Sequence, residues 1–124
     1  MAQTPQRVPD FFLHHIRYDV GSLVVTLAVG GEPHFEVQFD PPRAFRSFSE
    51  SDFFDYLRTF EGDPLITTPH RGSGVFMSET APYVIDYRTH VRPSESESTS
   101  SCLIATAQEC VEVVCFERPT IRFL

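Results

Sequence analysis

The sequence predicts an α+β domain in which a mostly antiparallel sheet of five or six strands carries one main helix on one face. Three observations support this fold class. Residues 34–39 alternate between polar and apolar side chains, which is typical of a strand with one buried face. Residues 23–29 form an apolar run that is rich in β-branched side chains. Residues 50–60 place apolar side chains at helical spacing.

The predicted main helix covers residues 50–60. Ser49 would cap its first turn, and Gly62 would supply the left-handed residue that ends it. Its apolar stripe follows the i, i+3, i+4, i+7 spacing and consists of Phe53, Tyr56, Leu57 and Phe60. We expect this stripe to pack on the sheet, while the acidic side chains of the opposite face remain in water.

The other predicted elements are short and separated by turns. Strands are expected over residues 11–18, 23–29, 34–39, 75–77, 102–106, 111–116 and 120–124, and the first three would form an antiparallel meander. Residues 62–64 and 67–74 are expected to be loop, with Leu65 and Ile66 packed beneath them. A second short helix is favoured at about residues 82–90, because Pro82 suits a first helical turn, although side-chain alternation there also fits a strand.

The chain of 124 residues predicts a single globular domain over residues 10–124. We expect residues 1–9 to form a disordered lead-in and the Ser/Glu-rich residues 92–101 to form a mobile loop. The first residues are polar and interrupted by proline, unlike a signal peptide, and no apolar run is long enough to cross a bilayer. These features predict a cytoplasmic protein without membrane association.

The charge balance points to a basic partner. There are 17 Asp and Glu residues against 10 Lys and Arg residues, which gives a formal net charge of −7. Nucleic acids and anionic membranes would repel such a protein. Acidity that only keeps the protein dissolved is the simpler alternative.

We find no catalytic, metal or cofactor motif in the sequence, so the expectation is a protein that is not an enzyme. His14 and His15 are neighbours on a predicted strand, where their side chains would point to opposite faces and could not hold one metal together. Cys102, Cys110 and Cys115 lack a C-x-x-C motif and are expected to be buried, reduced thiols. Cys110 and Cys115 would face opposite sides of their strand.

Several segments resemble the small immunity proteins of bacterial toxin–immunity systems, including those of contact-dependent growth inhibition. The segments are Phe45-Arg46 before the acidic helix, residues 78–83, residues 104–114 and residues 117–121. The resemblance implies a cytosolic protein that binds the C-terminal domain of a cognate toxin, often a basic nuclease, and covers its active site. An acidic surface would then present carboxylates where the toxin expects phosphates.

The candidate partner-binding residues combine carboxylates with aromatic side chains that could anchor an interface. They are Glu50, Asp52, Phe54, Asp55, Glu61, Asp63, Tyr83, Asp86 and Tyr87. We expect a monomer or weak dimer. The main alternative is a small-ligand or effector-binding module, which an apolar pocket beneath the main helix would indicate. A further alternative is an enzyme that pairs His34 or His90 with a cysteine of lowered pKa.

Overall fold

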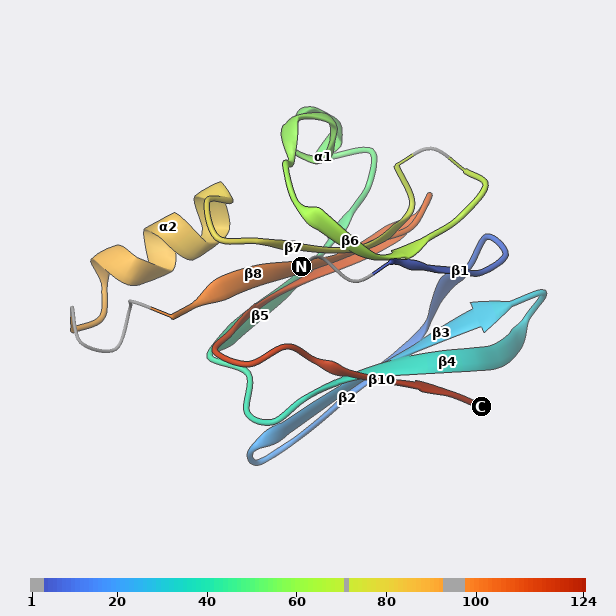
Figure 1. Ribbon diagram of the computed structural model, residues 1–124, viewed down its shortest axis with the longest axis horizontal. Coiled ribbons are helices and arrows are strands. Elements are labelled where there is room, and N and C mark those ends of the chain that lie inside the picture. The colour runs from blue at the N-terminus through green and yellow to red at the C-terminus, as the bar shows by residue number, and fades with distance from the viewer. Residues whose placement is uncertain (1–3, 71, 93–97) are drawn as a thin grey trace.

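The computed structural model describes residues 4–70, 72–92 and 98–124 and has an α+β fold in three layers (Figure 1). Within these residues, a four-stranded sheet packs face to face with a six-stranded sheet, and two short helices cover the outer face of the larger sheet. The α+β class is therefore confirmed, but the strands form two sheets where one was expected. Alternation identifies the residues that share a face of a strand, whereas long-range pairing decides which sheet the strand joins.

The four-stranded sheet contains the predicted meander. Its strands are β2 (Phe12–Asp19), β3 (Ser22–Val29), β4 (Glu32–Phe39) and β10 (Thr120–Phe123). They pair antiparallel in the order β10-β4-β3-β2. The apolar side chains of the alternating strand β4 are buried, as predicted, and these are Phe35, Val37 and Phe39. The chain leaves this sheet after β4 through a cis Asp40–Pro41 peptide bond.

The six-stranded sheet has the order β1-β6-β7-β8-β9-β5. Its strands are β1 (Gln6–Arg7), β5 (Ala44–Ser49), β6 (Asp63–Thr67), β7 (Gly74–Ser78), β8 (Ser100–Ala105) and β9 (Glu109–Cys115). β8 and β9 form the predicted C-terminal hairpin. β1 pairs parallel with β6, and the other neighbours pair antiparallel.

The main helix is shorter than the predicted span of 50–60. α1 covers Phe54–Thr59 because β5 extends to Ser49, which pairs with Glu109, and residues 50–53 form the turn between strand and helix. Ser49 therefore does not cap the helix, and the N-cap position is occupied by Phe53, whose hydrocarbon side chain has no acceptor. The second helix, α2 (Pro82–Thr89), agrees with the prediction, and Pro82 lies in its first turn.

Gly62 has a different role from the one predicted. Among the glycines of the described residues, those in the left-handed region are Gly21, Gly30, Gly31, Gly72 and Gly74, so Gly62 is not a left-handed helix cap. A Cβ atom on Gly62 would lie 2.7 Å from the backbone oxygen of Met77 and 2.9 Å from the Phe60 ring. Glycine is needed here because two backbones approach closely.

Four other expectations differ from the structure in part. Residues 62–64 and 67–74 were expected to be loop, but Asp63–Thr67 form β6. Residues 1–3 and 93–97 lie outside the described part of the chain. In the predicted disordered lead-in, residues 6–7 form β1 and Val8 is buried. In the predicted mobile loop, residues 100–101 begin β8. His14 and His15 do not point to opposite faces, since β2 has a bulge between Leu13 and His15 that brings the two rings together.

Strand β9 shows how the layers are connected. Val111, Val113 and Cys115 point into the core between the two sheets, together with apolar side chains of β3, β4, β7 and β8. The alternate residues of β9 point to the other side, where the helices lie, and these are Cys110, Glu112 and Val114. We call this outer side of the six-stranded sheet, with α1 and α2, the helical face. It carries the candidate site.

Candidate functional site

The predicted apolar stripe attaches α1 to the helical face. Phe53, Leu57 and Phe60 pack on a patch of the sheet that consists of Phe48, Leu103, Ala105 and Cys110. The rings of Phe48 and Phe53 lie 4.4 Å apart between centroids. Removal of these side chains from water stabilises the position of this six-residue helix, which would be too short to persist alone.

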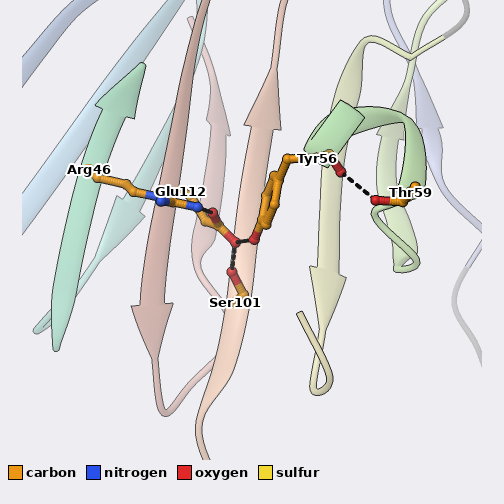
Figure 2. Close-up of polar contacts among 5 residues, drawn as sticks. All are labelled: Arg46, Tyr56, Thr59, Ser101 and Glu112. Carbon is orange, nitrogen blue, oxygen red and sulfur yellow. Dashed lines mark hydrogen bonds and ion pairs between the residues drawn. The ribbon is translucent and has the colours of Figure 1, made fainter. Parts of the chain in front are cut away.

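The fourth residue of the stripe, Tyr56, binds a buried carboxylate (Figure 2). The Glu112 side chain is 0% exposed, and one of its oxygens accepts hydrogen bonds from Arg46 Nη2 at 2.8 Å and Nε at 3.2 Å. The other oxygen accepts from the Tyr56 hydroxyl at 2.7 Å and from the Ser101 hydroxyl. A buried charge persists only when it is paired and hydrogen-bonded in this way. We call these four residues the Glu112 cluster.

Aromatic rings enclose the cation of the Glu112 cluster. The Arg46 guanidinium carbon lies 4.3 Å from the centroid of the Tyr83 ring in α2, and 5.1 to 5.2 Å from the rings of Phe48, Phe53 and Tyr56. Guanidinium groups bind favourably over aromatic faces at such distances. Arg46 therefore connects β5 to both helices.

The two tyrosines of this region remain protonated at neutral pH. Burial raises the pKa of Tyr56, and the hydrogen bond to Glu112 and its negative charge raise it further. Burial also raises the pKa of Tyr83, although the charge of Arg46 opposes this shift. Tyr56 is therefore a permanent hydrogen-bond donor to Glu112 across the neutral pH range.

The Glu112 cluster was not predicted from the sequence, although two signals in the chain indicate it. Glu112 interrupts an otherwise apolar run from Cys110 to Cys115, where a carboxylate needs a partner. Arg46 lies opposite Glu112 in the register of β5 with β9. That register depends on the recognition of β5 as a strand, whereas the sequence predicts that Phe45 and Arg46 lead into a helix.

The predicted carboxylates lie on or beside the two helices. Asp52, Asp55, Glu61, Asp63 and Asp86 are exposed, and Glu50 is half-buried. The Asp55 carboxylate is 3.7 Å from Arg58, and that of Asp86 is 3.7 Å from His90. Such exposed pairs contribute little free energy, so these carboxylates can exchange their partner for another cation.

The predicted aromatic anchors differ in accessibility. Phe54 lies on α1 and is 55% exposed. Tyr83 and Tyr87 are half-buried, because they pack with Ala81, Val84 and Val114 where α2 meets the sheet. Phe54 is therefore the aromatic anchor that a partner can reach, and α2 offers in addition the exposed side chain of Ile85.

One pocket opens on the helical face, and a second lies at the edge of the six-stranded sheet, where it also contacts Pro5 and Arg118. The first, of about 550 Å³, lies beside α1, and its apolar wall consists of Phe54, Leu57, Phe60, Phe76 and Leu103. Its rim includes Glu50, Arg58, His70 and Ala107. We call it the α1 groove. The second, of about 930 Å³, lies where α1 connects to β6, and its acidic side chains are Glu61, Asp63 and Glu79.

No family model, curated protein or solved structure matches the chain. The helical face is therefore the basis for a functional proposal. It combines exposed carboxylates, the accessible Phe54 and an apolar groove, on a helix that the Glu112 cluster attaches to the sheet.

The thiols lie in the interior. Cys102, Cys110 and Cys115 are free and buried, and Cys110 and Cys115 belong to opposite sides of the sheet, as predicted. Burial raises the pKa of all three, to about 11 for Cys115. These shifts are opposite to the lowered pKa that a thiolate nucleophile requires.

Residues 4–70, 72–92 and 98–124 contain no group of three or more His, Cys, Asp or Glu side chains arranged to hold a metal ion. Neither helix in the same ranges has the length and apolar character that crossing a membrane requires.

Proposed function

We propose that this protein binds a basic protein domain through its helical face and neutralises it, as an immunity protein does with its cognate toxin. The observation that carries the proposal is the set of exposed carboxylates around the exposed Phe54 on and beside α1. An apolar anchor inside a charged rim is typical of specific interfaces. The carboxylates would increase the association rate with a cationic surface and orient it.

The mechanism that fits this face is occlusion. A nuclease binds phosphates through Arg and Lys side chains, and a surface of carboxylates can occupy the same side chains. Tyr56 attaches α1 to the buried Glu112, so the helix is already in place before the partner arrives. A preorganised surface loses less conformational entropy on binding than a flexible one.

The test is co-purification with the toxin-like protein encoded beside this chain's gene, together with a nuclease assay. Wild-type protein should form a complex that weakens as salt increases and should inhibit the enzyme. The charge reversal Asp52→Lys with Asp55→Lys should weaken the complex about tenfold or more, since like charges would then face each other.

The matched control reverses two acidic residues of the four-stranded sheet, Asp19→Lys with Glu32→Lys. Both are exposed and lie away from the helical face, so the complex should keep its affinity. Equal loss in both variants would indicate a general charge effect and overturn the proposed binding face. Absence of any complex with the neighbouring protein would overturn the immunity function.

The α1 groove supports a second candidate function, the binding of a small apolar ligand. Its volume of about 550 Å³ and its wall of Leu57, Phe60, Phe76 and Leu103 fit the usual size and character of ligand sites. The substitution Ala107→Phe would narrow the rim. The fluorescence of an apolar dye such as anilinonaphthalene sulfonate should then fall, while the control Val20→Phe, at a fully exposed turn, should leave it unchanged.

A further inference from the structure

The edge strand β2 carries a pair of histidines whose Nδ1 atoms approach each other. The bulge between Leu13 and His15 places two residues of β2 against one position of β3. As a result, His14 Nδ1 lies 2.6 Å from His15 Nδ1, and the ring centroids are 4.9 Å apart. Both histidines are exposed, and their sheet lies on the opposite side of the molecule from the helices.

A neighbouring hydroxyl orients the second ring. His15 Nε2 lies 3.4 Å from Oγ1 of Thr26, which is 4% exposed. When Nε2–H donates to this hydroxyl, the lone pair of His15 is on Nδ1 and accepts the Nδ1–H of His14. One hydrogen then lies between the two Nδ1 atoms. A metal ion could replace this hydrogen and bind the lone pairs of both nitrogens.

From this geometry we infer that His14 and His15 form a binding site for a divalent transition metal ion, with Cu²⁺ as the preferred ion. Two ligand nitrogens at about 2.0 Å from a metal and at a right angle lie about 2.8 Å apart, close to the observed separation. Imidazole suits Cu²⁺, which binds most tightly of the divalent first-row ions and accepts square-planar coordination. Exposure of both rings lets water complete the coordination.

When a metal ion binds, the proton shared by His14 and His15 must leave the space between the two Nδ1 atoms. In the metal-bound state both Nδ1 atoms donate a lone pair to the ion, and the proton of His14 moves from Nδ1 to Nε2 through solvent. The hydrogen bond from His15 Nε2–H to Thr26 is retained, and such an outer partner fixes the ring of a metal-ligating histidine. Neutral imidazoles therefore bind the ion without net proton release.

The experiment is a Cu²⁺ titration of tag-free protein followed by electron paramagnetic resonance. We expect one ion per chain, with hyperfine coupling to two imidazole nitrogens. His14→Ala and His15→Ala should each weaken binding at least tenfold and leave coupling to one nitrogen. The outer-shell variant Thr26→Val should weaken binding by about tenfold.

The matched control is His90→Ala, which removes an exposed histidine of the helical face and should bind Cu²⁺ as the wild type does. Thermal melting of each variant without metal would confirm that it is folded. A two-nitrogen signal that persists in His14→Ala or His15→Ala would overturn the proposal. So would wild-type affinity equal to that of either variant, which would show an adventitious ion only.

Discussion

Arg46 donates two hydrogen bonds to a single carboxylate oxygen of Glu112, one from Nη2 at 2.8 Å and one from Nε at 3.2 Å. Tyr56 and Ser101 donate to the other oxygen. The strands β5, β8 and β9 and the helix α1 therefore meet at one buried charge. Removal of a single donor leaves that charge partly uncompensated, which is the most costly kind of change in a buried ion pair.

Loss of the Arg46 cation should destabilise the fold. We expect Arg46→Met to lower the free energy of unfolding by about 3 kcal/mol, because the fully buried Glu112 carboxylate would lose its cation. Urea unfolding followed by circular dichroism measures the change. The control Arg17→Met removes an exposed partner of Asp19 and should cost about 0.5 kcal/mol or less. If both variants lost the same free energy of unfolding, burial of the ion pair would not explain the cost at Arg46.

Simultaneous replacement of both charges should restore stability. In Arg46→Met with Glu112→Leu, no buried charge remains, so we expect the double variant to be more stable than Arg46→Met alone. The coupling energy follows from the double-mutant cycle of the two single variants and the pair. Additive costs would show that the two side chains act independently.

The Tyr56 hydroxyl should control the attachment of α1. We expect Tyr56→Phe to lower the free energy of unfolding by about 2 kcal/mol, since a hydrogen bond to a charged group is lost. Amide hydrogen exchange of residues 54–60 should accelerate more than that of β3. The control Phe54→Leu changes an exposed ring on the same helix and should leave both quantities nearly unchanged.

Alkaline pH should destabilise the protein. Folding raises the pKa of the buried thiols and of Tyr56 and Tyr83, so the unfolded chain loses these protons first. These groups should therefore leave stability unchanged from pH 7 to about pH 9 and lower it above that pH, by about 1.4 kcal/mol per pH unit for each group that is ionised only in the unfolded chain. Urea unfolding from pH 7 to pH 11 measures this slope.

Two variants separate the thiol from the tyrosine contribution to this slope. Cys115→Ala should reduce the slope between pH 9 and about pH 11, the window set by the usual thiol pKa and its value in the fold. Tyr56→Phe should reduce it only above pH 10. A slope that neither substitution changes would contradict the assignment of the alkaline transition to these groups.

Close backbone packing should make Gly62 intolerant of any side chain. We expect Gly62→Asn to cost about 1 to 3 kcal/mol, because its Cβ atom would overlap the backbone of Met77. Gly21, with φ of 84° and open space around it, should accept Asn at a smaller cost, since Asn tolerates the left-handed region. Equal tolerance at both sites, measured by thermal melting, would contradict the requirement for glycine at the close backbone approach of Gly62.

Local patterns predicted the parts of the fold that depend on nearby residues. The meander of β2, β3 and β4, the hairpin of β8 and β9, and α2 all have clear alternation, turn residues or a proline signal. β6 was missed because Pro64 suggests a loop. The structure accommodates this proline because β1 pairs only with Ile66 and Thr67, so the edge of β6 at Pro64 needs no donor.

The site was predictable only in part. The predicted carboxylates other than the half-buried Glu50 are exposed, because charged side chains favour water wherever the strands go. Phe54 is exposed because it lies outside the apolar stripe of the helix. Tyr83 and Tyr87 are half-buried because α2 packs on Val114 of β9. Val114 is distant from α2 in the sequence, so local patterns do not predict the accessibility of the two tyrosines. The paired histidines depend on a bulge, which an alternation rule does not include.

Strands β8 and β9 belong to two packing layers at once, since successive side chains serve the core between the sheets and the helical face in turn. Detachment of the helices would expose to water the outer side of the same strands whose inner side forms the core between the two sheets. A molecule that binds α1 should therefore raise the melting temperature of the whole protein, because it binds the folded chain and not the unfolded one. Thermal-shift screening of unlabelled protein can thus search for the partner without any assay of its activity.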